Sequence, residues 1–285
     1  MKLSAIIINY NTQEKTTEAV EDFLAAAEGF DFEVVLIDNA SKEVPSWPSA
    51  SWGERVNFIY NQKNLGFAGA ANQGLLKALG EYVILLNSDA LINKKTLTAM
   101  LDCLQANDSI GAVGPSFIYP DGSFQTSSGY FPTPWNFTTS FLMLSKILPT
   151  GFLLYRNFFN RLSFTSSTSP LKVDWLSGGC LLFKRSLIKE IGLLDENFFF
   201  GVEDLDYCYR IKKSGRLIIY LPFVSVIHSH GFSSGGRRSA SKLKKELDGM
   251  IYFLKKHFPK KRLFRAWVRF LYFVKITLFR LLLIR

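Results

Sequence analysis

The sequence predicts an α/β fold in which a mainly parallel sheet carries helices on both faces. Over the first 120 residues, short apolar runs alternate with helix-length segments, as is typical of such sheets. The run at residues 83–86 is apolar throughout and is closed by Asn87, Ser88 and Asp89, as expected of a central strand buried on both faces. Hydrophobic residues make up 48% of the 285 residues, which is enough to fill one large domain plus an appendage.

The elements of the first half follow from their patterns. Strands are expected at residues 3–8, 33–37, 56–60, 83–86 and 110–117. Helices are expected at residues 12–27, 64–79 and 94–106. Thr12 can cap the first helix, and Glu14 in its first turn suits the helix dipole. Residues 43–56 hold prolines and tryptophans without a period and are expected to form a loop.

The second half is less regular. Residues 119–170 are rich in Ser, Thr, Phe and Pro without a clear period, so they form either part of an acceptor side or a variable surface excursion. A regular pattern resumes at residues 173–183. It is followed by a short helix at 185–191 and another helix that begins near Glu203. Two strands are expected on either side of Pro222, at residues 216–221 and 223–227.

The positive charge of the chain is concentrated at its end. The formal net charge is +10, and no acidic residue follows Asp248. The ten basic residues beyond it account for the whole excess: Lys255, Lys256, Lys260, Lys261, Arg262, Arg265, Arg269, Lys275, Arg280 and Arg285. A neutral body with one basic, aromatic tail indicates an anionic membrane surface as partner and argues against nucleic acid.

The tail is too interrupted by charge to be a confident membrane span. Residues 263–284 are strongly apolar but contain Arg265, Arg269, Lys275 and Arg280. At helical spacing, Arg262, Arg265, Arg269 and Arg280 fall near one face, which suits a helix lying in the membrane interface. The alternative is a C-terminal helix packed on the body or in a homodimer.

The cysteines and the N-terminus indicate the compartment. Cys103, Cys180 and Cys208 are odd in number and lack metal-type spacing, which fits a reducing compartment. The apolar run after Met1 is too short for a signal peptide. We therefore expect a cytoplasmic protein, peripheral on the inner face of the plasma membrane.

Polar clusters follow the strands of the predicted sheet. The carboxyl ends of parallel strands meet at one edge, where α/β proteins bind ligands. The clusters expected to converge there contain Asn9, Asn11, Asp38, Asn64 and Asp89. Asp38 could accept from a nucleoside base N–H or a ribose hydroxyl, and Asp89 could hold a divalent cation. Each cluster alone is also an ordinary strand-to-helix turn.

Familiar phosphate-binding motifs are missing from this pattern. The first strand is followed by no G-x-G-x-x-G, and the chain contains no G-x-x-x-x-G-K-[ST]. A dinucleotide-fold dehydrogenase and a P-loop enzyme are therefore disfavoured.

The second half adds further candidates. Gly178 and Gly179 mark a close backbone approach, and Trp175 is either a stacking platform for a sugar or a core residue. Glu203, Asp204 and Asp206 crowd three carboxylates into four residues at a helix start.

A histidine and a basic loop follow the last strand. His228 is either a surface residue or a second metal ligand beside Asp89. The glycine-containing basic loop at residues 233–238 could close over a phosphate.

These landmarks together resemble the inverting family 2 glycosyltransferases of the GT-A (Rossmann-like) fold, particularly the bacterial rhamnosyltransferase-like branch. The matching segments occur in the order of the family across about residues 3–235. They are Ile6 to Thr12, Val34 to Ser41, Asn64 to Phe67, Asn87 to Asp89, Trp175 to Gly179, Gly201 to Asp206, and His228.

The resemblance implies roles for individual residues. Asn87-Ser88-Asp89 stands where the family has Asp-x-Asp, so Asp89 would bind the Mg²⁺ or Mn²⁺ that bridges the donor diphosphate. Asn87 departs from that motif, because the family has a carboxylate there. Asp204, preceded by Glu203, would be the catalytic base. His228 would be a further metal or diphosphate ligand, with His230 the weaker candidate.

The remaining roles divide between donor and acceptor. Donor binding would fall to Asn9, Asn11, Asp38, Asn64, Asn87 and Ser88, and acceptor binding to Trp175, Gly178 and Gly179. The Gln-x-x-Arg-Trp signature of processive members is absent, so one sugar per encounter is expected.

The resemblance also implies a domain division and a function. Residues 1–238 would form the GT-A domain, with a nucleotide-sugar-binding half at 1–118 and an acceptor and catalytic half at 119–238. Residues 239–285 would form the basic amphipathic helical tail. The implied function is metal-dependent transfer of one sugar, with rhamnose as a candidate, from a nucleotide-sugar to a lipid-linked or polysaccharide acceptor in cell-surface glycan synthesis.

Two other functions stay open at this point. A sugar nucleotidyltransferase would share the nucleotide-binding half, but no Gly-rich triphosphate loop with Arg or Lys follows the first strand. A non-catalytic nucleotide-sugar-binding or lipid-binding protein would explain Asn87 as a sign of lost metal chemistry.

Overall fold

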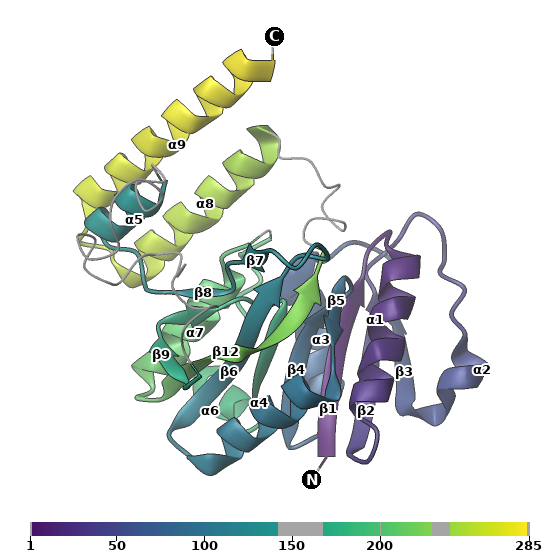
Figure 1. Ribbon diagram of the computed structural model, residues 1–285. Coiled ribbons are helices and arrows are strands. Elements are labelled where there is room, and N and C mark those ends of the chain that lie inside the picture. Colours follow the sequence, from purple (N-terminus) through teal and green to yellow (C-terminus); the bar gives the residue numbers. More distant parts are fainter. Residues whose placement is uncertain (1, 142–167, 200, 230–239, 284–285) are drawn as a thin grey trace.

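The computed structural model describes residues 2–141, 168–199, 201–229 and 240–283. Within these ranges, ten strands join in one mixed sheet that helices cover on both faces (Figure 1). The elements of the first half are β1 (Lys2–Asn9), α1 (Gln13–Ala26), β2 (Asp31–Asp38), α2 (Ser49–Trp52), β3 (Val56–Tyr60), α3 (Gly66–Lys77), β4 (Tyr82–Asn87), β5 (Ala90–Ile92), α4 (Lys94–Ala106) and β6 (Ile110–Ile118). The predicted alternation of strands and helices is confirmed.

The second half completes the sheet and adds two long C-terminal helices. Its elements are β7 (Phe124–Gln125), β8 (Ser128–Gly129), α5 (Pro134–Phe141), β9 (Leu171–Val173), β10 (Trp175–Leu176), β11 (Cys180–Lys184), α6 (Leu187–Ile191), α7 (Glu203–Lys213), β12 (Leu217–His228), α8 (Ala240–His257) and α9 (Arg262–Leu283). Much of the irregular stretch at 119–170, and His230 with the loop at 233–238, lie outside the described residues.

The sheet follows the order β3-β2-β1-β4-β11-β6-β12-β5. The first four strands are parallel, and β12 is parallel to β6. β11 runs antiparallel between β4 and β6, so the sheet is mixed at the point where its two halves meet. All four parallel strands of the first half therefore end at one edge, together with the loops that follow them.

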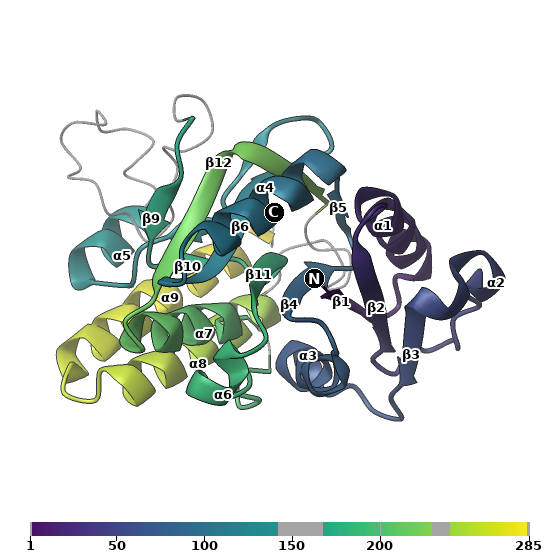
Figure 2. The same cartoon turned by 90° about the horizontal axis from the view of Figure 1, so that it is seen from below.

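Alternate side chains of each central strand enter different cores. Along β1, Ala5 and Ile7 face α1 and α4, whereas Ile6 faces α3. Figure 2 shows α1 and α4 on one face of the sheet and α3, α6 and α7 on the other. A Cβ on Gly74 would lie 2.6 Å from Ile6 Cγ2, so glycine is needed for α3 to pack this closely on the sheet.

Three local expectations were wrong. The segment at 43–56 is not wholly a loop, because it contains α2 and the 3₁₀ turn Gly53–Arg55. Pro222 does not divide two strands, because β12 continues past it and a register shift between Leu221 and Ser225 absorbs it. Thr12 precedes α1, but its side chain makes no capping bond there and contacts Asn9 Oδ1 at 3.1 Å instead.

A buried ion network ties α8 to α7. Asp206, fully buried in the first turns of α7, lies 2.6 Å from His257 Nε2 and 2.8 Å from Lys256 Nζ. It also accepts from Arg210 Nε at 2.9 Å, and Lys256 reaches Asp195 at 2.6 Å. The crowding of carboxylates that the sequence shows at this helix start is therefore relieved by cations from α8 and from α7 itself.

The helix α9 packs along α8 and α5 (Figure 1). Its inward stripe is formed by Phe264, Val268, Leu271 and Tyr272, all buried. Across the described ranges, no helix is long and apolar enough to cross a membrane.

Candidate active site

The ends of β1 and β2 hold the first part of the site. Asn9 and Asp38 are register partners, and Asn9 Nδ2 donates to Asp38 Oδ1 at 2.7 Å. Ser41 donates to the same oxygen through its hydroxyl at 2.6 Å, and its backbone N–H donates to Asp38 Oδ2 at 3.1 Å. Asp38 is thus fixed at the sheet edge with its Oδ2 atom able to accept one further hydrogen bond.

Two asparagines brace the loops of this edge. The Asn11 backbone adopts a left-handed φ of 57°, and Asn11 Oδ1 accepts from the Lys42 N–H at 2.8 Å. Asn64 Oδ1 accepts from Asn39 Nδ2 at 3.0 Å and from the Gly66 N–H at 2.8 Å. Both side chains therefore shape the loops at the edge of the sheet where the donor is expected to bind.

The end of β4 meets the end of β12 in an imidazole–carboxylate pair. Asp89 Oδ1 lies 3.2 Å from His228 Nε2, and both residues are buried, with 4% and 5% of their surface exposed. Asn87 Nδ2 lies 3.1 Å from the same ring nitrogen. On the other side of the ring, His228 Nδ1 lies 2.5 Å from Gln125 Oε1.

These partners assign the tautomer of His228. The Asn87 amide nitrogen can only donate, so Nε2 accepts and Nδ1 carries the proton that Gln125 Oε1 receives. This single lone pair lies between the Asn87 amide and Asp89 Oδ1. A metal ion bound to Nε2 and Asp89 would therefore take the place of the hydrogen bond from Asn87.

The donor set limits which cation fits. Carboxylate oxygen suits Mg²⁺ and Mn²⁺, and an imidazole nitrogen shifts the preference from the harder Mg²⁺ towards Mn²⁺. In the part of the chain that the structure describes, no group of three or more His, Cys, Asp or Glu residues could hold a metal. Asp89 and His228 would therefore rely on oxygens of a bound substrate to complete the coordination.

The start of α7 holds the candidate base. Asp204 Oδ2 accepts from the Gly178 N–H at 3.1 Å, and Asp204 Oδ1 accepts from the Leu205 N–H at 2.7 Å. Burial raises the pKa of Asp204 above the ordinary aspartate value, although these two backbone N–H groups oppose the shift. A raised pKa suits a carboxylate that must accept a proton near neutral pH.

Glu203 differs from Asp204 in its surroundings. It is 8% exposed, and its Oε2 atom has no hydrogen-bond partner among the described residues. Burial, and after it the neighbouring charge of Asp204, raises the pKa of Glu203. The two adjacent carboxyl groups therefore favour one ionised member, and the hydrogen bonds to Asp204 favour that residue.

The turn before these acids is strained. Val202 has a φ of 73°, a left-handed conformation that is rare for a β-branched residue and costs about 1–3 kcal/mol. Gly249 of α8 packs on it so closely that a Cβ there would lie 3.3 Å from Val202 Cγ2. The helix α8 thus supports the turn that positions Glu203 and Asp204.

Gly178 and Gly179 join the two halves of the site. Gly179 O accepts from the Asn87 N–H at 3.0 Å, while the Gly178 N–H donates to Asp204 Oδ2. A Cβ on Gly179 would lie 3.1 Å from Asn87 Nδ2, so a side chain at position 179 would displace Asn87, which contacts the candidate metal ligand His228. The two glycines therefore set the spacing between the candidate metal ligands and the candidate base.

Short contacts connect the predicted site residues along one edge. Asp38 contacts Asn9, whose Oδ1 accepts from Thr12, and Thr12 Oγ1 lies 3.2 Å from Ser88 Oγ. From the Asn87-Ser88-Asp89 triplet, contacts lead to His228 and through the glycines to Asp204.

Trp175 is the predicted site residue that the structure places elsewhere. It is 7% exposed in the core beside α7. Of the two roles that the sequence left open for this residue, the structure favours core packing.

The sequence missed two residues of the site, Ser41 and Gln125. Ser41 is an ordinary turn residue by sequence, and Gln125 sits in the irregular stretch after β6. Ser41 ends the segment from Val34 that resembles the family, and its contact with Asp38 is local, so the sequence could have indicated it. Gln125 carries no such signal, because its partner His228 is 103 residues away.

Gln125→Leu should weaken metal use without damaging the chemistry. Loss of the Oε1 acceptor frees the imidazole of His228 to rotate and change tautomer, which for such supporting residues costs about 10–100-fold in metal affinity. The Mn²⁺ concentration for half-maximal activity should rise by that factor, while kcat at saturating Mn²⁺ stays near wild type. Gln13→Leu, at an exposed glutamine whose side chain bonds to Ser46, is the control. An unchanged metal requirement in the Gln125 variant would contradict the assigned tautomer.

The fold and the edge site define a glycosyltransferase of the GT-A class. Residues 4–192 match the family model for Glycosyl transferase family 2, and the chain belongs to that family. The predicted family and fold class are confirmed.

Named relatives include rhamnosyltransferases. The chain is 30% identical over 229 residues to the N-acetylglucosaminyl-diphospho-decaprenol L-rhamnosyltransferase of Mycobacterium tuberculosis, covering 74% of this chain and 70% of that protein. It is 24% identical over 233 residues to the dTDP-rhamnosyl transferase RfbF of Shigella flexneri, covering 81% of this chain and 70% of that protein.

A solved structure supports the fold. The mannosyltransferase PcManGT of Pyrobaculum calidifontis, solved with GDP-Man and Mn²⁺, matches with a TM-score of 0.58 at 19% identity. The match covers 91% of this chain and 65% of that one, so this chain spans slightly less than two thirds of the mannosyltransferase.

Proposed function

We propose that this glycosyltransferase is inverting and metal-dependent and moves one sugar, with rhamnose as the candidate, from a nucleotide-sugar to a lipid-linked acceptor at the cytoplasmic face of the membrane. The observation that carries the proposal is the connected set of contacts from Asp38 to Asp204 along one sheet edge. The names of the two rhamnosyltransferase relatives support the choice of sugar, and the first of them also supports a lipid-linked diphosphate acceptor.

The donor would lie along the edge from β2 to β4. Asp38 would accept a hydrogen bond from the nucleoside through Oδ2, and Asn9 and Ser41 would keep that carboxylate in place. Asn11 and Asn64 would hold the loops on either side. A divalent cation bound between Asp89 and His228 would stabilise the negative charge that develops on the leaving diphosphate.

The acceptor would approach from the side of α7. Asp204 would take the proton of the attacking hydroxyl while the new bond from that oxygen to the anomeric carbon forms and the bond to the diphosphate breaks. The nucleoside diphosphate leaves with the electron pair of that bond. Because attack is opposite the leaving group, the anomeric configuration inverts. The protein contributes positioning and electrostatic stabilisation.

A donor screen tests this function. A cognate nucleotide-sugar should raise the melting temperature of the protein more with Mn²⁺ than with a chelator, because a ligand that binds the folded state stabilises it. The stabilising donor should then yield a glycosylated product whose anomeric configuration, read by NMR, is inverted. Formation of pyrophosphate from a nucleoside triphosphate and a sugar phosphate would instead assign a nucleotidyltransferase. Binding without turnover in the presence of acceptor and Mn²⁺ would assign a non-catalytic protein.

A further inference from the structure

The outer face of α9 exposes an unusual amount of apolar surface. Six large side chains on this helix are between 40% and 89% exposed: Leu263, Trp267, Phe270, Phe273, Leu278 and Leu281. At 100° per residue, all six fall within about 140° of the helix circumference, on the side away from the buried stripe. The helix therefore has two apolar faces, of which only one is packed on the body.

The same helical geometry divides the basic residues of α9 into two groups. Arg262, Arg269 and Arg280 are exposed and line one border of the apolar face. Arg265, by contrast, donates to the backbone carbonyls of Phe258 and Pro259, and Lys275 lies over the ring of Phe141 at 4.6 Å. Two of the charges that interrupt the apolar sequence thus serve local packing, so they leave the outer apolar face continuous.

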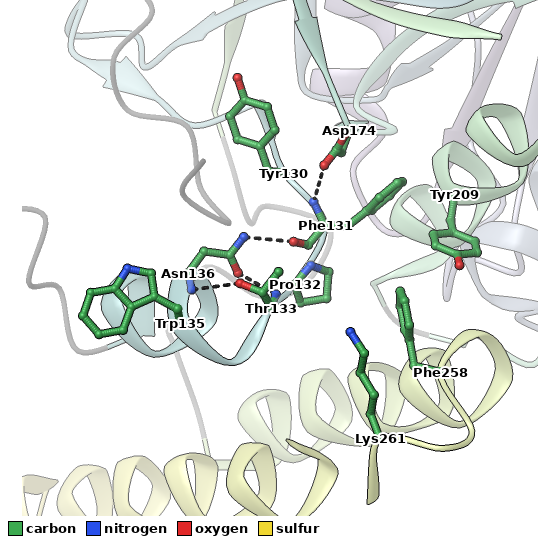
Figure 3. A pocket seen from close by; sticks show the side chains of 10 residues that line it. All are labelled: Tyr130, Phe131, Pro132, Thr133, Trp135, Asn136, Asp174, Tyr209, Phe258 and Lys261. Atoms are coloured by element: carbon green, nitrogen blue, oxygen red, sulfur yellow. Dashed lines mark hydrogen bonds between the residues drawn. The ribbon is translucent and has the colours of Figure 1, made fainter. Parts of the chain in front are cut away.

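The exposed face extends from α9 onto α5. Trp267 Nε1 donates to Thr138 Oγ1 at 2.7 Å, which fixes the two helices to each other. Trp135 lies one turn before Thr138 on the same side of α5 and is 66% exposed. Trp135 and Lys261 lie at opposite sides of a cavity of about 370 Å³ between α5 and the α8–α9 turn (Figure 3).

We propose that this surface, formed by the outer face of α9 and Trp135, docks on an anionic lipid bilayer. Tryptophans and phenylalanines with a border of arginines are the composition of helices that lie in the membrane interface. Lys260 and Lys261, just before α9, add exposed positive charge, and no acidic residue follows Asp248. Charge complementarity therefore favours an anionic bilayer over a neutral one.

Membrane docking is inferred from the exposed side chains of α9 and α5 and is independent of which sugar the enzyme transfers. Its consequence for the proposed function is positional, because docking would hold the enzyme where a lipid-linked acceptor resides. α9 is 22 residues long, and at 1.5 Å per residue it would lie flat along about 33 Å of the interface.

Vesicle co-sedimentation tests the docking surface. The full chain should bind vesicles containing phosphatidylglycerol and bind pure phosphatidylcholine vesicles much more weakly. Phe270→Ser with Phe273→Ser should lower the partition coefficient by at least about tenfold, since both rings lose their burial in the interface. Arg269→Ser with Arg280→Ser should lower it about fivefold per residue on anionic vesicles only.

The matched control removes exposed apolar side chains elsewhere. Leu76 and Leu79, at and beyond the end of α3, are 72% and 64% exposed, and Leu76→Ser with Leu79→Ser should leave vesicle binding unchanged. Equal loss in this control, or full binding by the phenylalanine double variant, would overturn the proposal.

Two further measurements distinguish membrane docking from self-association of the chain and from loss of catalysis. Light scattering that shows a dimer, converted to a monomer by the phenylalanine substitutions, would assign the face to a second copy of the chain and overturn membrane docking. Metal-dependent donor hydrolysis should be unaffected in the phenylalanine double variant. Failure of that reaction in the wild type would count against the proposed function and leave the docking result standing.

Discussion

Replacing Asp204 by asparagine should lower the rate of sugar transfer by about 10²–10⁴-fold, the range that general-base catalysis contributes. The amide keeps the size of the side chain and can still accept from the Gly178 N–H, but it cannot take the proton of the acceptor hydroxyl. The dissociation constant of the donor, measured by calorimetry with Mn²⁺, should stay near that of the wild type, because Asp38 and Asp89 are untouched.

Glu203→Gln is the matched control for this variant. Burial and the charge of Asp204 both favour a protonated Glu203, and glutamine resembles that neutral form. We therefore expect a much smaller loss of rate than in Asp204→Asn. If the two variants lose the same activity, or if only Glu203→Gln does, the assignment of Asp204 as base is wrong.

The pH dependence of kcat/KM should also identify Asp204 as the base. Asp204 acts in its ionised form, so kcat/KM should rise with pH as that carboxyl loses its proton. Because burial raises the pKa of Asp204, the rise should lie above the range of an ordinary aspartate. The residual activity of Asp204→Asn should lack this rise.

Asp206→Asn should lower the free energy of unfolding by about 3–5 kcal/mol, as expected when one partner of a buried ion network is removed. Asp206 is fully buried, and the substitution removes the carboxylate that pairs with Arg210 and leaves Lys256 with Asp195 alone. Urea unfolding measures the change. Glu190→Gln, which breaks an ion pair with Arg216 at the surface, should not measurably change the unfolding midpoint.

The same network should make the free energy of unfolding depend on pH in the acid range. Burial alone would raise the pKa of Asp206, but the hydrogen bonds from His257 and Lys256 and the charge of Arg210 outweigh it and leave the pKa below the ordinary value. A lowered folded-state pKa contributes stability above the unfolded-state value, near pH 4, and this contribution is lost as pH falls further. Stability of the wild type should therefore decline below about pH 4 more steeply than that of Asp206→Asn. Equal slopes would show that the network does not stabilise the fold.

Local patterns predicted the first half of the molecule well. Strands β1 to β4 and the ends of α4 follow from apolar runs and turn residues, because the information lies within a few neighbouring residues. The polar residues at the strand ends could be placed at one edge for the same reason, since parallel strands share an edge whatever their order in the sheet.

Features that join distant segments could not be predicted in this way. Asp206 and His257 are 51 residues apart, and Gln125 reaches His228 across 103 residues. Nothing in the neighbourhood of either residue marks its partner. The continuation of β12 past Pro222 is also invisible locally, because it depends on the register shift against β6.

The position of α8 has a practical consequence for shortening the chain. The helix packs between the acid-bearing α7 and the apolar α9, supporting the Val202 turn through Gly249 and holding Asp206 through Lys256 and His257. Trimming after about residue 258 would remove the buried stripe of α9 and uncover one side of α8 and of α5. Trimming that begins at residue 240 would also remove the contacts of α8 with α7, which carries the proposed base Asp204, and should abolish turnover even on an acceptor that carries no lipid.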